Sequence, residues 1–88
     1  MTKDVPYMSA GNEGRAMNAI KLANASQIFG FDFFWSDFRY MTGNDELIHK
    51  VHLHVFGEVF VGEAHKKGVA KDVAANAFFR VHPELWPS

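Results

Sequence analysis

At 88 residues and a formal charge of −1, the chain is long enough for one domain with a single hydrophobic core but not for two. Hydrophobic residues make up 48% of it, including nine phenylalanines and two tryptophans, so the sequence predicts a folded protein. The near-neutral charge argues against a strongly electrostatic nucleic-acid binder, because phosphate binding depends on lysine and arginine. Cysteine is absent, which excludes disulfides and thiolate metal sites.

No apolar stretch approaches the roughly 20 residues that a membrane-spanning helix needs. The N-terminal segment also lacks the apolar core of a signal peptide. We therefore expect no membrane association and an intracellular protein, nuclear or cytoplasmic.

The first helix is expected after a flexible arm. Residues 1–13 show no periodicity and contain Pro6 and Gly11, which favours an arm over a regular element. From residue 14 to residue 29 the apolar spacing becomes helical, and Gly30 is a natural stop. One side of this helix carries Ala19, Leu22, Ala23, Ser26 and Phe29.

Three strands are expected next. Residues 33–41 are rich in aromatic side chains, and residues 42–45 have the composition of a turn. Residues 49–56 alternate strictly, with His49, Val51, Leu53 and Val55 on one face and Lys50, His52, His54 and Phe56 on the other. Gly57 and Glu58 then form a tight reversal into a third strand that ends near Gly62, in which Phe60 points inward between Val59 and Val61.

The last third of the chain predicts a second helix with a basic start. Apolar residues recur at helical steps and should lie against the sheet: Ala70, Val73, Ala74, Ala77, Phe78 and Val81. Lys67 and Lys71 are four residues apart near the N-terminus of the helix, where the macrodipole and free N–H groups favour an anion such as phosphate. The alternative is an ordinary amphipathic helix with a solvated lysine edge.

These elements predict an α+β fold of order α-β-β-β-α. Two helices would pack on one face of a three-stranded antiparallel sheet, as a two-layer sandwich with the other face open. The domain would span residues 14–82. Residues 83–88 would form a tail in which Leu85 or Trp86 folds back on the helices.

This element order and the last helix together resemble the double-stranded RNA-binding domain, over about Met17 to Val81. Ala70-Lys71, two spacer residues and Ala74-Ala75 look like the end of the family's motif of Lys-Lys, spacer, Ala-Lys, two spacers and Ala-Ala. Lys67 matches the first lysine and Lys71 the third, whereas Gly68 stands where the second is expected and Lys66 lies just before. From Ala64 onward the spacing is similar to a domain of the adenosine deaminases that act on RNA.

The resemblance implies shape-based binding of an A-form RNA duplex over roughly 16 base pairs, as a module of a larger RNA-processing or RNA-regulating protein. The second helix would bridge phosphates through Lys66, Lys67 and Lys71, with His65 adding charge when protonated. The first helix would place Lys21 and Asn24 in a minor groove, Asn24 standing where family members usually have glutamate. The loop departs most, because the family's Gly-Pro-x-His is replaced by residues 43–46, which carry Asp45 and Glu46.

The open sheet face supports the alternative function of a protein-interaction or homodimerisation module, because degenerate family members commonly use this face or a strand edge. The expected contact residues form a partly apolar surface: Trp35, His52, His54, Phe56, Val59 and Val61. His52 and His54 have a spacing seen in metal sites, but no further ligands are evident, so we expect neither a metal nor another cofactor. No catalytic motif is present, so we expect no enzymatic activity.

Overall fold

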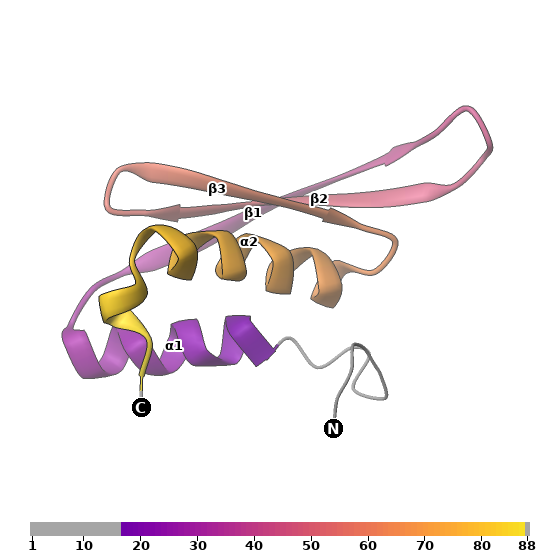
Figure 1. Cartoon of the computed structure of the whole chain (residues 1–88). Helices are drawn as coiled ribbons and strands as arrows, with labels where there is room; N and C mark the ends of the chain where they lie inside the picture. Colours follow the sequence, from indigo (N-terminus) through magenta and orange to yellow (C-terminus); the bar gives the residue numbers. More distant parts are fainter. Residues whose placement is uncertain (1–16, 88) are drawn as a thin grey trace, which may run out of the picture.

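A computed structural model describes residues 17–87 of the chain. Its elements are α1 (Met17–Phe29), β1 (Phe33–Met41), β2 (Leu47–Val55), β3 (Glu58–Ala64), α2 (Lys67–Val81) and a short 3-10 helix, η2 (Pro83–Leu85). The strands form one antiparallel sheet in the order β1-β2-β3. Both helices lie on the same side of this sheet (Figure 1). The predicted two-layer α-β-β-β-α fold is confirmed, whereas the predicted arm at residues 1–13 lies outside the described residues.

Strand pairing divides the sheet side chains between an inner face, toward the helices, and an outer face. Val51, Leu53 and Val55 of β2 are buried on the inner face, as their alternation predicted. Leu53 pairs with Trp35 on one side and Phe60 on the other, so these two residues share the inner face. The expected inward position of Phe60 is thereby confirmed.

Helix α2 packs directly on β2 and β3. Its residues Ala70, Ala74 and Phe78, spaced four apart, are fully buried. Gly62 of β3 lies opposite them: a Cβ at this position would come within 2.7 Å of the amide nitrogen of Ala74 and nearer still to the carbonyl oxygen of Ala70. The glycine and the two alanines therefore allow the backbones of the helix and the strand to meet.

The buried sides of the two helices differ from the predicted ones. Val73 and Val81 of α2 and Phe29 of α1 are exposed, although their spacing placed them on the packed sides. The second buried row of α2 is instead Ala75 and Phe79, which joins the core cluster that also holds Leu22 and Ala25 of α1. The difference arises because α2 packs against two neighbours. One side of the helix faces the sheet, and the adjoining side faces α1.

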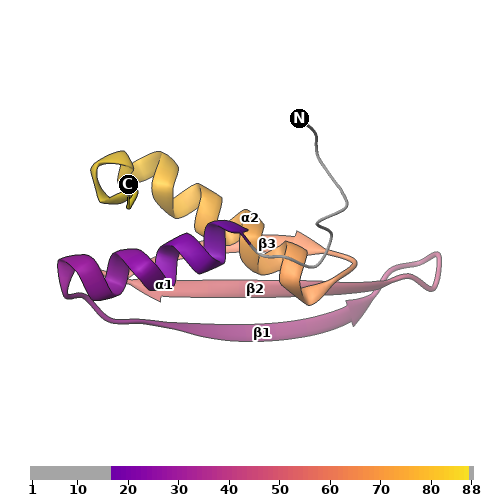
Figure 2. The ribbon, with the colours of Figure 1, turned by 90° about the horizontal axis from the view of Figure 1, so that it is seen from below.

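A side chain of α2 holds the beginning of α1. Asp72 accepts hydrogen bonds from the backbone N–H of Asn18 and, at 3.0 Å, from the Asn18 side-chain amide. A carboxylate at this position also complements the positive end of the α1 macrodipole. Figure 2 shows the two helices side by side over the sheet.

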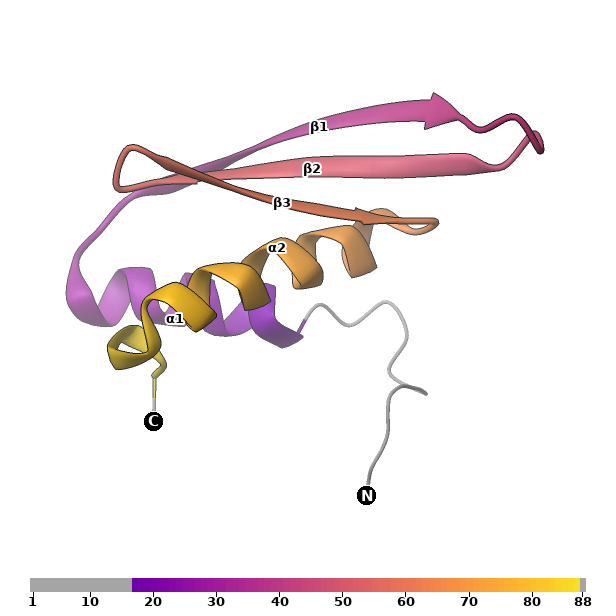
Figure 3. The ribbon, with the colours of Figure 1, turned by 45° about the horizontal axis from the view of Figure 1, so that its top comes forward.

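The chain after α2 folds back on the helices, as expected. Leu85 of η2 packs against the core, and the Trp86 ring lies 4.8 Å from the ring of Phe79. The turn between β2 and β3 lies at the same end of the molecule as the C-terminus of α2, whereas the β1–β2 loop projects past the N-terminus of α2 (Figure 3). The N-terminus of α2 therefore lies near the β1–β2 loop, and its C-terminus lies near the β2–β3 turn.

We predict that Gly62→Ala lowers the free energy of unfolding by about 1–3 kcal/mol, because the added methyl group would force α2 away from β3. Urea unfolding followed by circular dichroism measures the change. Gly43→Ala is the matched control, since a Cβ there meets no atom within 4 Å and should change stability by less than about 0.5 kcal/mol. Equal stability of the two variants would contradict the close contact.

Candidate functional site

The predicted phosphate-binding lysines gather at the N-terminal end of α2. His65, Lys66 and Lys67 are exposed, and Lys66 is the extended residue that precedes the first helical turn. Lys71 follows one turn later, on the same side as Lys67. We call these four residues the lysine end.

Two of the three lysines also have partners within the protein. The Nζ atom of Lys67 lies 3.2 Å from a carboxylate oxygen of Asp37 on β1. The Nζ atom of Lys71 lies 5.3 Å from the centre of the Trp35 ring, a cation–π distance. Because the Lys67–Asp37 pair is about half exposed on both sides, water and salt screen it and both groups can still contact a ligand.

Lys21 and Asn24, the predicted contacts on α1, line one shallow hollow together with Gln27, Ile28 and Pro87. Lys21 extends its Nζ atom to 5.8 Å from the Trp86 ring. The C-terminal tail therefore helps to position Lys21, which the sequence analysis did not foresee. Trp86, which precedes Pro87, was the one residue of the tail that could have suggested a contact with a lysine.

The β1–β2 loop keeps its acidic residues in solvent. Thr42 organises the loop, since its hydroxyl oxygen accepts hydrogen bonds from the backbone N–H groups of Asn44 and Glu46, each at 3.2 Å. Asp45 has a positive φ of 64°, and both Asp45 and Glu46 are exposed. Two carboxylates at the tip of a projecting loop would repel a phosphate backbone.

The outer face of the sheet is covered by aromatic and aliphatic side chains. His52, His54, Val59 and Val61 lie there, as predicted. The strand register adds residues that the sequence analysis did not single out; we call the whole surface the open sheet face: Phe34, Ser36, Phe38, Tyr40, Ile48, Lys50, His52, His54, Val59, Val61 and Glu63.

Aromatic rings pack against the two histidines of this face. Phe34, 62% exposed, stacks on the ring of His54 at 4.4 Å, and Ser36 contacts the same histidine at 3.0 Å. Phe38, 52% exposed, lies edge-on to His52 at 5.0 Å. The histidines are thus half-buried parts of an aromatic surface.

The predicted positions of Trp35 and Phe56 on the open sheet face are wrong. Trp35 pairs with Leu53 and packs against the core on the inner face. Phe56 does not continue β2, because it lies in the β2–β3 turn with a positive φ of 57°, and its ring contacts Phe31 at 5.0 Å. In both cases strand pairing, rather than composition, decides the direction of the side chain.

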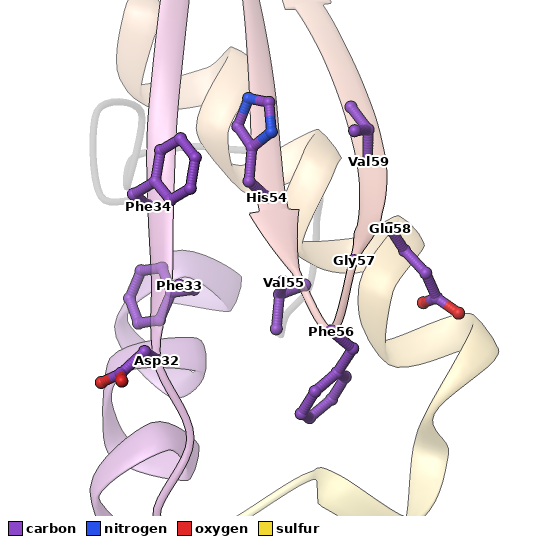
Figure 4. A pocket seen from close by; sticks show the side chains of 9 residues that line it. All are labelled: Asp32, Phe33, Phe34, His54, Val55, Phe56, Gly57, Glu58 and Val59. Carbon is purple, nitrogen blue, oxygen red and sulfur yellow. The ribbon is translucent and has the colours of Figure 1, made fainter.

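A pocket opens at the end of the sheet where β1 begins and β2 turns into β3 (Figure 4). The sequence alone does not predict this pocket, because its walls meet only through pairing of Phe33 with Val55. The lining residues are Asp32, Phe33, Phe34, His54, Val55, Phe56, Gly57, Glu58 and Val59.

Residues 17–87 contain no group of three histidine or acidic side chains arranged to hold a metal ion. Within the same range, no helix has the length and apolar character needed to cross a membrane. Comparisons with protein-family models and with curated proteins find no match to this chain.

Tyr40 and Glu63 form a polar border on the open sheet face. The Tyr40 hydroxyl donates a 2.9 Å hydrogen bond to Glu63, whose other carboxylate oxygen lies 3.7 Å from the Nζ atom of Lys50. The hydrogen bond to Glu63, and secondarily desolvation and the negative charge of that carboxylate, raise the pKa of Tyr40 above its ordinary value.

We predict that Glu63→Ala lowers the pKa of Tyr40 toward the ordinary value for tyrosine, because both the hydrogen-bond acceptor and the negative charge are removed. Ultraviolet titration in a Tyr7→Phe background isolates Tyr40, and Glu46→Ala is the control. Since the folded state raises this pKa, the contact should stabilise the fold below the ordinary tyrosine pKa and lose its effect as pH rises through the folded value. An unchanged titration curve would exclude the hydrogen bond.

Proposed function

We propose that this protein is a double-stranded RNA-binding module of a larger RNA-processing or RNA-regulating protein. The observation that carries the proposal is the lysine end, in which Lys66, Lys67 and Lys71 stand at the start of α2 in an α-β-β-β-α fold. Resemblance of the α2 sequence to the double-stranded RNA-binding domain supports the same function.

Phosphate would be bound by charge and helix geometry together. The first turn of α2 has free N–H groups and the positive end of the macrodipole, and no acidic residue lies in that turn. Lys66, Lys67 and Lys71 would each contact a phosphate of the major groove. Lys67 would exchange the Asp37 carboxylate for a phosphate oxygen, which lowers the net gain from this contact.

Helix α1 would provide the second contact region. Lys21 and Asn24 line one hollow, where an ammonium group can bind phosphate and an amide can both donate to and accept from a ribose 2′-hydroxyl. The exposed carboxylates of Asp45 and Glu46 would keep the β1–β2 loop out of the second minor groove. We therefore expect shape-based binding that is weak for the family and strongly dependent on salt.

We predict that Lys67→Ala combined with Lys71→Ala weakens binding to a duplex RNA of about 20 base pairs, which spans the expected site. The slope of the logarithm of the binding constant against the logarithm of the salt concentration should become shallower by about two, one for each lost phosphate contact. Fluorescence anisotropy at several salt concentrations measures both effects. Lys50→Ala, on the open sheet face, is the matched control and should leave affinity nearly unchanged. If the unaltered protein binds no duplex at low salt, the RNA function is wrong.

A second candidate function is homodimerisation through the open sheet face. Phe34, Phe38, Val59 and Val61 are exposed on either side of the β2 histidines and make the face partly apolar, which often marks an interface. By standard strand spacing, three strands of seven to nine residues cover about 400 Å² in projection, against about 800 Å² per partner in a standard interface. A second copy presents an equal apolar face, so we expect a weak, concentration-dependent dimer.

We predict that Val61→Lys abolishes such a dimer, because it places a charge among the apolar side chains of this face. Sedimentation equilibrium over a range of protein concentrations measures the monomer fraction. Val81→Lys is the control, since Val81 is even more exposed (58% against 43%) but belongs to α2. A monomer at the highest concentration, or equal loss of the dimer in both variants, would exclude homodimerisation through this face.

A further inference from the structure

The pocket at the start of β1 has the size and lining of a ligand site. Its volume is about 430 Å³, within the range usual for small-molecule pockets. Rings of Phe33, Phe34 and Phe56 form much of its wall, together with His54. We call it the hairpin pocket, because the β2–β3 turn closes one side of it (Figure 4).

The backbone holds one aromatic wall of this pocket in an unfavourable conformation. Phe56 and Gly57 both have positive φ, 57° and 72°, which places the two central residues of the turn in the left-handed region. Asparagine or glycine would adopt this conformation with little strain, whereas a bulky side chain resists it. The Phe56 ring packs on Phe31 and Phe78 yet is still 50% exposed, so a large aromatic face is presented at a place where the turn itself does not favour one.

Two carboxylates border the pocket. Asp32 and Glu58 lie on opposite sides of Phe56, with the Glu58 carboxylate turned away from the ring (Figure 4). Among residues 17–87, no lysine or arginine lines the pocket. Glu58 contacts His82 at 3.0 Å, and Glu84 lies 3.6 Å from the other ring nitrogen of His82. His82 follows the last turn of α2 and packs 5.4 Å from the Phe56 ring, so the negative end of the α2 macrodipole also lies nearby.

We propose that the hairpin pocket binds the guanidinium group of an arginine side chain from a partner protein. Aromatic faces attract a cation through their quadrupole, and a planar, weakly hydrated guanidinium also stacks on them. Asp32 can pair with it at the rim. A phosphate would be repelled by the carboxylates, and a purely apolar side chain would bury Asp32 without a partner. This proposal does not rest on RNA binding, because the lysine end lies at the other end of α2 (Figure 3).

The test uses two short peptides, acetyl-Gly-Arg-Gly-amide and the same peptide with citrulline, the neutral isostere of arginine. Each is titrated into the isotopically labelled full chain and followed by NMR. The arginine peptide should shift the amides of residues 32–34 and 54–59, with a dissociation constant of about 1 mM. The citrulline peptide should bind at least about fivefold more weakly, since it lacks the charge. Equal binding of both peptides, shifts located elsewhere, or no shifts would overturn the proposal.

Variants then separate the aromatic and acidic contributions. Asp32→Asn should weaken arginine-peptide binding about two- to fivefold, as expected for loss of an exposed ion pair. Phe34→Leu, which retains an apolar side chain but removes the ring, should weaken it by a similar factor. Asp45→Asn is the control, because it removes an exposed carboxylate at the opposite end of the sheet. An equal effect of Asp45→Asn would show that general charge, not the pocket, binds the peptide.

The same samples distinguish this site from the proposed RNA function. Asp32→Asn should leave duplex RNA affinity unchanged. An equal loss of RNA and peptide binding in this variant would overturn the proposal that the hairpin pocket is a site separate from the lysine end. Arginine-specific shifts in a protein that binds no duplex would support the hairpin pocket and contradict the RNA function alone.

Discussion

At Gly62 the backbone of β3 meets the backbone of α2, and the positions of all the candidate surfaces depend on this contact. A side chain larger than hydrogen would displace the helix, because the carbonyl of Ala70 and the amide of Ala74 occupy the space. The contact fixes the height of α2 above the sheet and its position along the sheet. Both helices pack on the inner side, so no element within residues 17–87 covers the outer face.

The position of α2 brings the lysine end next to β1, and this proximity has two opposing consequences. Asp37 and Trp35 hold Lys67 and Lys71 in place, which reduces the conformational entropy that a phosphate contact would cost. The Asp37 carboxylate also competes with phosphate for Lys67. Because both groups are about half exposed, screening limits the strength of this competition, so the pre-organised lysine remains available to an RNA ligand.

The sequence predicted the fold well because its signals were local and periodic. Strict alternation in β2 placed Val51, Leu53 and Val55 on the inner face and His52 and His54 on the outer face. Alternation failed to orient β1, because aromatic residues occupy both of its faces and only pairing with β2 determines which side Trp35 takes. It failed again at Phe56, where a turn residue with positive φ ended the strand one position early.

The candidate surfaces were only partly predictable, for a related reason. The lysine end lies within one short segment, so the spacing of Lys67 and Lys71 was enough to bring the two together. The hairpin pocket joins residues from two segments, 32–34 and 54–59, that are separated in the sequence, and the spacing of its acidic and aromatic residues matches no known motif. Such a site becomes visible only when the register Phe33–Val55 is known.

The arrangement of these surfaces would allow the proposed RNA and protein contacts to coexist. The open sheet face and the hairpin pocket share Phe34, His54 and Val59, so a partner protein that covers the face would also close over the pocket. The helices lie on the opposite side of the sheet, where the lysine end stays accessible. A duplex and a protein partner would therefore not compete for space. Their binding would be coupled only through the shared core between α2 and the sheet, which is closely packed at Gly62 and leaves little room for α2 to move.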